Sequence, residues 1–133
     1  MAENNKGNAA KRLPTGAGQG PPATHTAAVL VYATFPDFEQ AESTGRRLIE
    51  AGLAACINIL PAMTSIYRWQ GAIETAQEVV LIAKTVVARA DAVTGLIVEL
   101  HPYETPAVLV IPVVAGSLPY LQWIGRETSI AGG

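Results

Sequence analysis

Residues 67–83, with the sequence YRWQGAIETAQEVVLIA, predict a long β-hairpin near the centre of the chain. Gln70-Gly71 suits the two central positions of a tight turn, although less strongly than Asn-Gly does. The run after the turn, residues 73–87, is continuously apolar at its centre, as in a strand covered on both faces. The run before the turn, residues 54–69, also reads as extended. Pro61 within it predicts a bulge, a bend or an edge position.

Stretches with helical periodicity lie on both sides of this hairpin. Residues 34–37 predict a helix start with the proline in the first turn, and Gly52 supplies the left-handed residue that ends this helix. Residues 93–100 place apolar side chains at positions i, i+3, i+4 and i+7 of a second helix. That helix must end near His101, because the residue before a proline is disfavoured in the helical conformation.

Two further strands and a terminal helix complete the order of elements. Residues 27–33 and 108–114 predict strands, and Ser117 is placed to cap a helix over residues 118–124 that ends at Gly125. The order is strand, helix, strand, strand, helix, strand, helix. It predicts an α+β fold of the ferredoxin-like split βαβ type, a sandwich with a long β-hairpin and a short C-terminal helix.

The first 26 residues differ in composition from the rest. They contain three basic residues and one acidic residue, so their formal charge is +2, and residues 27–133 carry the remaining −4 of the net −2. The segment has too few large apolar side chains to offset the entropy lost on ordering. We therefore expect a flexible N-terminal tail over residues 1–26 and one globular domain over residues 27–133.

The composition of the whole chain excludes several classes of protein. Half of its 133 residues are hydrophobic, which is enough for a core. The net charge of −2 argues against a nucleic-acid partner, and no apolar run is long enough to span a membrane. The single cysteine forms neither an internal disulfide nor a paired-cysteine metal site. We expect a soluble, cytoplasmic protein.

The lengths of the predicted elements indicate self-association. Hairpin arms of about 13 residues reach roughly 43 Å, whereas helices of about 14 residues reach roughly 21 Å. Half of a largely apolar hairpin would then be left uncovered, which monomers rarely tolerate. Burial between copies of the chain is the simplest remedy.

His101-Pro102-Tyr103-Glu104 is a candidate metal site, because it gathers an imidazole, a phenol and a carboxylate in a stiff turn. His101 and Glu104 could share a divalent metal ion, or Glu104 could satisfy a nearby backbone or basic group. Cys56 is a third candidate ligand, although its apolar surroundings favour a small buried side chain.

A second set of residues could line a ligand cleft. Tyr67, Trp69, Tyr103 and Trp123 could stack on a flat ligand, or they could pack in an interface, where aromatic residues are enriched. Lys84 interrupts an apolar run. It either reaches the sheet edge with its ammonium group or pairs with a carboxylate such as Glu78 or Glu104.

Several chemistries are excluded by motif. The chain has no nucleophile elbow, no glycine-rich phosphate loop and no paired histidines on a helix. The run of residues 79–83 lacks the exposed aromatic and basic side chains of an RNA-recognition strand. We therefore expect no catalytic activity and no organic cofactor.

Five strings in order along the chain resemble the CutA family of divalent-cation tolerance proteins. They are Leu53-Ala54-Ala55-Cys56-Ile57-Asn58-Ile59-Leu60-Pro61, Thr64-Ser65-Ile66-Tyr67-Arg68-Trp69-Gln70-Gly71, Glu78-Val79-Val80-Leu81-Ile82-Ala83-Lys84-Thr85, His101-Pro102-Tyr103-Glu104 and Tyr120-Leu121-Gln122-Trp123-Ile124. The resemblance extends from about Val29 to Thr128.

This resemblance implies a homotrimer similar in architecture to the PII signalling proteins, linked to tolerance of copper and other divalent ions. The copper-ligand positions of some bacterial members, one cysteine and two adjacent histidines, fall on Ala33, Leu100 and His101 here. Of these three positions, only His101 has a side chain that can coordinate a metal ion, so we expect any metal binding to be weak.

Two functional hypotheses result. One is a trimeric protein that binds or responds to divalent cations through His101, Glu104 and Cys56. The other is a PII-like sensor that binds a small anionic or planar metabolite in clefts between subunits near Lys84, Trp69 and Trp123.

Overall fold

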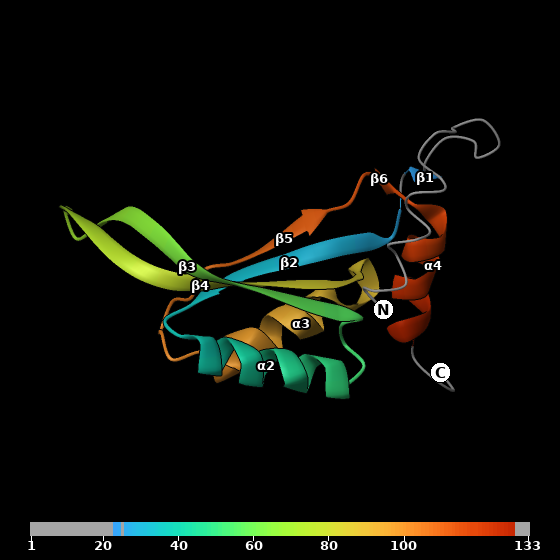
Figure 1. Cartoon of the computed structure of the whole chain (residues 1–133), viewed down its shortest axis with the longest axis horizontal. Coiled ribbons are helices and arrows are strands. Elements are labelled where there is room, and N and C mark those ends of the chain that lie inside the picture. Colours follow the sequence, from blue (N-terminus) through green and yellow to red (C-terminus); the bar gives the residue numbers. More distant parts are fainter. Residues whose placement is uncertain (1–22, 25, 130–133) are drawn as a thin grey trace.

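The computed structural model describes residues 23–24 and 26–129. Their strands and helices follow in the order β1 (Ala23–Thr24), β2 (Ala28–Phe35), α2 (Phe38–Glu50), β3 (Cys56–Trp69), β4 (Ala72–Val86), α3 (Val87–Leu100), β5 (Val108–Pro112), β6 (Ala115–Gly116) and α4 (Leu118–Glu127). Figure 1 shows an elongated molecule with a hairpin at one end and α4 at the other.

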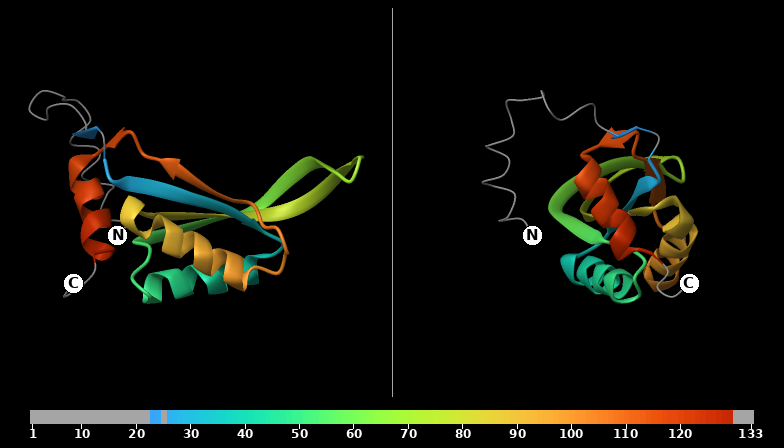
Figure 2. Two further views of the ribbon diagram at one scale, coloured as in Figure 1. Left: turned by 180° about the vertical axis from the view of Figure 1, so that it is seen from behind. Right: turned by 90° about the vertical axis from the view of Figure 1, so that its right-hand side faces the viewer.

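The main sheet has four antiparallel strands in the order β3-β4-β2-β5. Each of α2 and α3 joins two strands that are separated by one other strand, which is the split βαβ arrangement. Both helices cover the same face of the sheet (Figure 2). The prediction of an α+β fold with an antiparallel sheet is confirmed.

The buried core lies between this sheet and its two helices. Alternate residues of the central strands, such as Val31, Ala33 and Leu81, are fully buried against helix residues that include Leu48 and Ile97. The intervening strand residues point to the other face, because side chains alternate along a strand. Among the described helices, only α4 reaches that other face, where it crosses one end (Figure 2). We call it the open face.

The start of α2 differs from the prediction. Strand β2 continues to Phe35, and the helix begins at Phe38 with Asp37 as its N-cap. Asp37 Oδ1 accepts a hydrogen bond of 2.8 Å from the Gln40 amide. Pro36 thus lies before the helix and not in its first turn, because the capping carboxylate fixes the start. Gly52 has φ of 71° directly after the helix, as predicted.

The long hairpin of β3 and β4 confirms the central prediction from the sequence. Its arms have 14 and 15 residues, and its outer half extends beyond the ends of α2 and α3 (Figure 1). Gln70 and Gly71 both have positive φ, 50° and 84°, as the tight turn requires. The register shifts between Leu60 and Met63, which places a bulge at Pro61.

The end of the chain differs in two details. Strand β5 ends at Pro112, two residues before the predicted end, and a short strand β6 follows. Helix α4 continues through Gly125 to Glu127. Gly125 does not adopt the positive φ that would end the helix there; among the described glycines, only Gly52 and Gly71 have positive φ. Ser117 occupies the predicted N-cap position, but its side chain makes no capping hydrogen bond.

Most of the predicted tail, residues 1–22 together with residue 25, lies outside the described residues. Ala23 and Thr24, near the end of that segment, form β1 and pair with Gly116 and Ala115 of β6. None of the helices in the described part of the chain has the length and apolar character needed to cross a membrane.

Candidate functional site

His101 ends helix α3 and is 8% exposed. Its Nε2 lies 2.6 Å from the carbonyl oxygen of Thr34, and its Nδ1 accepts a 3.1 Å hydrogen bond from the Tyr103 amide. Because the Tyr103 amide is a donor, Nδ1 carries no proton, and the proton on Nε2 is donated to Thr34. The imidazole is therefore neutral, and both of its nitrogens are already engaged.

Aromatic contacts hold this imidazole from two sides. The Phe35 ring stacks on it with 4.5 Å between centroids, and the Tyr103 ring lies 4.8 Å away at a tilt of 52°. The predicted turn at Pro102 thus folds back over the histidine. His101 fixes the loop between α3 and β5 to strand β2.

Tyr103 also connects this loop to the base of the hairpin. Burial, together with the nearby Glu78 carboxylate, the Tyr67 phenol and a hydrogen bond to Glu78, raises the pKa of Tyr103. Glu78 Oε1 also accepts a 2.7 Å hydrogen bond from Ser65. Tyr67 and Tyr103, two residues of the predicted cleft, therefore lie near each other, and Tyr103 lies beside the Glu78 carboxylate.

The three predicted metal ligands are not brought together in one protomer. In the sheet register, Cys56 pairs with Lys84, and Lys84 pairs with Leu30 of β2. His101 contacts Thr34, four residues further along β2. Four residues of a strand span about 13 Å, so Cys56 and His101 lie far apart. Glu104 is exposed on the loop after His101. Within residues 23–24 and 26–129, no group of three His, Cys, Asp or Glu side chains is suited to hold a metal ion.

Lys84 lies at the opposite end of the sheet, against helix α4. Its Nζ donates a 3.1 Å hydrogen bond to the Tyr120 hydroxyl and lies 5.3 Å from the centroid of that ring. The Tyr120 and Trp123 rings are 5.5 Å apart at an angle of 30°. Lys84 and Trp123, both predicted cleft residues, thus meet through Tyr120.

Tyr120 belongs to this cluster but was not among the predicted cleft residues. The signal that could have found it is its spacing from Trp123, because residues three apart on a helix share a face.

The predicted pairing of Lys84 with Glu78 or Glu104 is not made. The one ion pair in the described part of the chain joins Arg46 to Glu42. Glu78 lies six residues from Lys84 on the same strand, about 20 Å away.

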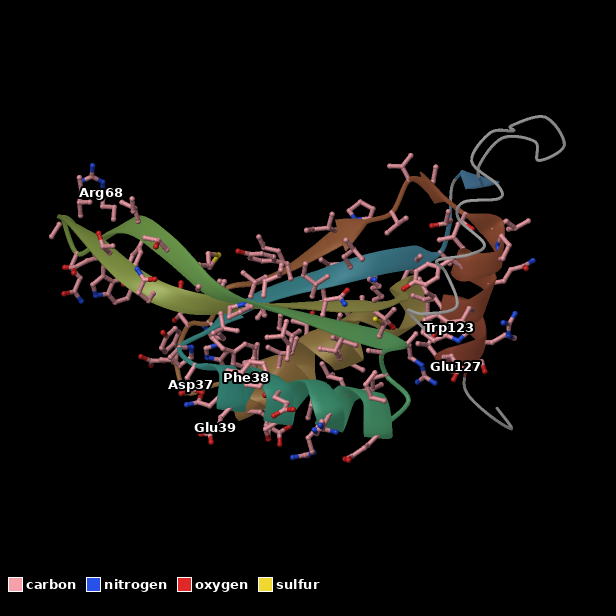
Figure 3. All side chains as sticks on the ribbon, viewed as in Figure 1. Asp37, Phe38, Glu39, Arg68, Trp123 and Glu127 are labelled. Atoms are coloured by element: carbon pink, nitrogen blue, oxygen red, sulfur yellow. The ribbon has the colours of Figure 1, made fainter. Side chains whose placement is uncertain are left out.

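The tip of the hairpin carries the remaining predicted residues. Tyr67 is 44% exposed and Trp69 is 57% exposed. Figure 3 shows Arg68 at one end of the long axis of the molecule and Trp123 at the other. The predicted cleft residues therefore do not line one cleft in a single protomer.

A shallow hollow of about 270 Å³ lies between α2 and β3. It contains none of the predicted site residues. Its lining is made by Glu42, Gly45, Arg46, Ile49, Glu50, Ile57 and Ile59.

The antiparallel split βαβ sandwich with a projecting hairpin places the chain among proteins of the ferredoxin-like fold. The sequence profile of the CutA1 divalent ion tolerance protein family matches residues 29–127. The chain is 38% identical to the divalent-cation tolerance protein CutA of Thermus thermophilus over 99 residues, which cover 74% of this chain and 96% of that one. This chain belongs to the CutA1 divalent ion tolerance family.

Other relatives agree with this assignment. The human protein CutA is 40% identical over 97 residues, or 73% of this chain, and the chain spans only 54% of the length of that relative. The crystal structure of CutA from Xylella fastidiosa superimposes with a TM-score of 0.76 at 39% identity, covering 78% of this chain and all of that one. The likeness thus extends to both sequence and fold.

Proposed function

We propose that this protein acts in the tolerance of divalent metal ions, copper among them, and that it does so without catalysis, in the cytoplasm and as a homotrimer. The family match over residues 29–127 is the observation that carries the proposal. Curated relatives at 38% identity bear the name divalent-cation tolerance protein.

The distribution of exposed apolar side chains supports self-association. On the hairpin, Ile66 is 71% exposed and Ile73 is 69% exposed, and on the open face Leu60 and Leu109 are 53% and 60% exposed. Apolar groups of this size left in water across a large surface favour association with other copies. The number of three subunits and the PII-like arrangement come from the family resemblance.

In this proposal a divalent cation binds weakly at the loop that holds His101 and Glu104. A metal ion that takes either imidazole nitrogen must displace the hydrogen bond to Tyr103 or the one to Thr34. Such a displacement lowers the net affinity. Cys56 would have to come from a different copy of the chain to join these ligands.

Titration with copper and zinc tests this site. His101→Gln keeps a polar side chain and removes the imidazole, and His25→Gln removes the only other imidazole of the chain as a matched control. We expect His101→Gln to weaken binding by about tenfold or more and His25→Gln to leave it unchanged. Calorimetry on variants that sediment like the wild type is the measurement.

Two outcomes would contradict this site. Unchanged affinity in His101→Gln would remove His101 from it. A loss in His25→Gln alone would move metal binding to the N-terminal segment.

A second function is favoured by a separate observation, the cluster of Lys84, Tyr120 and Trp123. An ammonium group beside two aromatic rings suits a small anionic or planar metabolite. In this alternative the protein is a PII-like sensor. No nucleic acid and no membrane is a partner in either proposal.

A further inference from the structure

Met63, the only methionine among the described residues, lies on the open face of the sheet. Strands β2 and β3 lie on either side of β4, yet the Tyr32 hydroxyl of β2 donates a hydrogen bond of 3.7 Å to Met63 Sδ of β3. Tyr32 alternates with the fully buried Val31 and Ala33, so the contact is made on the open face. Both Tyr32 and Met63 are partly exposed. The thioether is therefore within reach of a small solute.

The hydrogen bond leaves one side of this sulfur free. A thioether sulfur has two lone pairs, which are weak hydrogen-bond acceptors. The Tyr32 hydroxyl occupies one of them. The same lone pairs make a methionine sulfur reactive toward peroxides. An oxidant therefore reaches the lone pair that points away from Tyr32 more readily than the other one.

We propose that Met63 is a site of oxidation by hydroperoxides and that Tyr32 directs the reaction to one epimer of the sulfoxide. The free lone pair of Sδ attacks the terminal oxygen of the hydroperoxide, so that an S–O bond forms while the O–O bond breaks. The proton of the transferred oxygen passes to the departing oxygen, which leaves as an alcohol, or as water where the oxidant is hydrogen peroxide. The sulfur loses two electrons and the peroxide gains them. The new oxygen lies on the side of the sulfur away from Tyr32.

The sulfoxide makes this part of the open face polar. Tyr32 pairs in register with Leu109, which is 60% exposed on the same face. Burial of a sulfoxide oxygen between copies of the chain without a hydrogen-bond donor costs free energy. Oxidation of Met63 therefore weakens assembly, and enzymatic reduction of the sulfoxide restores it, since this step is reversible. The effect on assembly rests on the proposed homotrimer, whereas the oxidation itself does not.

Hydrogen peroxide is the probe for the oxidation, and peptide mapping by mass spectrometry follows it at Met63. Ile111→Glu places a charge on the open face that opposes its covering by other copies. We expect Met63 in this variant to react within about tenfold of the rate of free methionine, and more slowly in the wild type, where other copies cover the face. A reaction in Ile111→Glu slower than this limit would overturn the site.

The epimers of the product test the role of Tyr32. The two classes of methionine sulfoxide reductase each reduce one epimer, so treatment of the digested protein with either class measures both forms. We expect one epimer in about threefold excess or more in the wild type, and nearly equal amounts in Tyr32→Phe, which keeps the ring and removes the donor. Tyr67→Phe removes a different phenol as the matched control and should keep the excess. Equal epimers in the wild type would overturn the role of Tyr32, as would an unchanged excess in Tyr32→Phe.

Sedimentation tests the effect on assembly. Wild-type protein oxidised at Met63 should dissociate at a concentration about tenfold or more above that of the reduced protein. Met63→Leu keeps an apolar side chain of similar size, so the same treatment should leave its assembly unchanged, which also controls for oxidation of Cys56. Equal assembly of the reduced and oxidised wild type would overturn this effect. Monomers in the reduced wild type would instead contradict the proposed homotrimer, so the two failures are distinguishable.

Discussion

At the residue scale, His101 and Lys84 are two polar side chains among apolar neighbours, and they differ in how far their hydrogen-bond and charge partners are supplied. The imidazole of His101 has a partner for each nitrogen, at 2.6 Å and 3.1 Å. Among the described residues, the ammonium group of Lys84 contacts a phenol oxygen and an aromatic ring and forms no ion pair. A group whose bonds are complete holds the structure together, whereas a charge without its counter-charge is free to bind a ligand.

Tyr103 gives a prediction on pH. Its pKa is raised above the ordinary value of 10.0 by burial and by the Glu78 carboxylate, so the folded state keeps the proton to a higher pH than the unfolded state does. The tyrosine's contribution to stability is therefore complete below the unfolded pKa and is lost as the pH rises through the folded pKa. We expect the free energy of unfolding to fall above about pH 10, and to fall less in Tyr103→Phe.

Denaturant unfolding from about pH 9 to about pH 11 measures this difference. Absorbance titration of the four tyrosines gives an independent readout, since the variant should lack the phenol with the raised pKa. An identical alkaline decline in both proteins would show that Tyr103 is not its source.

At the element scale, the fold could be predicted from the sequence where local signals agree with the packing. The turn at Gln70-Gly71, the bulge at Pro61 and the end of α3 before Pro102 each follow from the backbone restrictions of one residue. The end of α4 could not be predicted in this way. Gly125 permits a helix end but does not impose one, and the contact of Arg89 Nε with the Thr128 carbonyl, at 2.9 Å, holds the last turn.

The candidate site was predictable only in part, for a related reason. The contact of Lys84 with α4 and that of His101 with β2 join residues distant in sequence. Residue types indicate which side chains carry chemistry, but only the sheet register shows that Cys56 and His101 lie at different ends. Tyr67 and Trp69 suited a cleft by type, yet β3 places them on either side of Arg68, which lies at the opposite end of the molecule from Trp123 (Figure 3).

The bulge in β3 gives a prediction for the hairpin. Ala62 has φ of 64°, a conformation that costs a residue with a Cβ roughly 1–2 kcal/mol. Glycine avoids this cost but loses more entropy on folding, so we expect Ala62→Gly to stabilise the fold by up to about 1 kcal/mol. Ala76→Gly, on the facing strand, should destabilise it by about 0.5–1 kcal/mol. Denaturant unfolding at a fixed protein concentration measures both, and a loss of stability in Ala62→Gly would contradict the strained bulge.

At the scale of the whole molecule, the two faces of the sheet differ in how far they are covered from water. The inner face is covered by α2 and α3, whereas the open face keeps large apolar side chains in contact with water, among them Leu109 at 60% exposure and Ile111 at 42%. Burial of apolar surface contributes about 25 cal/mol per Å² before the costs of association. A second and a third copy on this face, with the hairpin extending to a neighbour, would remove both surfaces from water together.

We expect the wild-type chain to remain a trimer at nanomolar concentration in analytical ultracentrifugation. Leu109→Glu places a charge on the open face, and burial of an unpaired charge costs several kcal/mol, so this variant should dissociate or fail to assemble. Val98→Glu is the matched control, because Val98 is 46% exposed on α3, outside the proposed interface, where a surface substitution changes stability by no more than about 0.5 kcal/mol. Folded wild-type monomers at nanomolar concentration would contradict the trimer, and dissociation of Val98→Glu but not of Leu109→Glu would move the interface to the helical face.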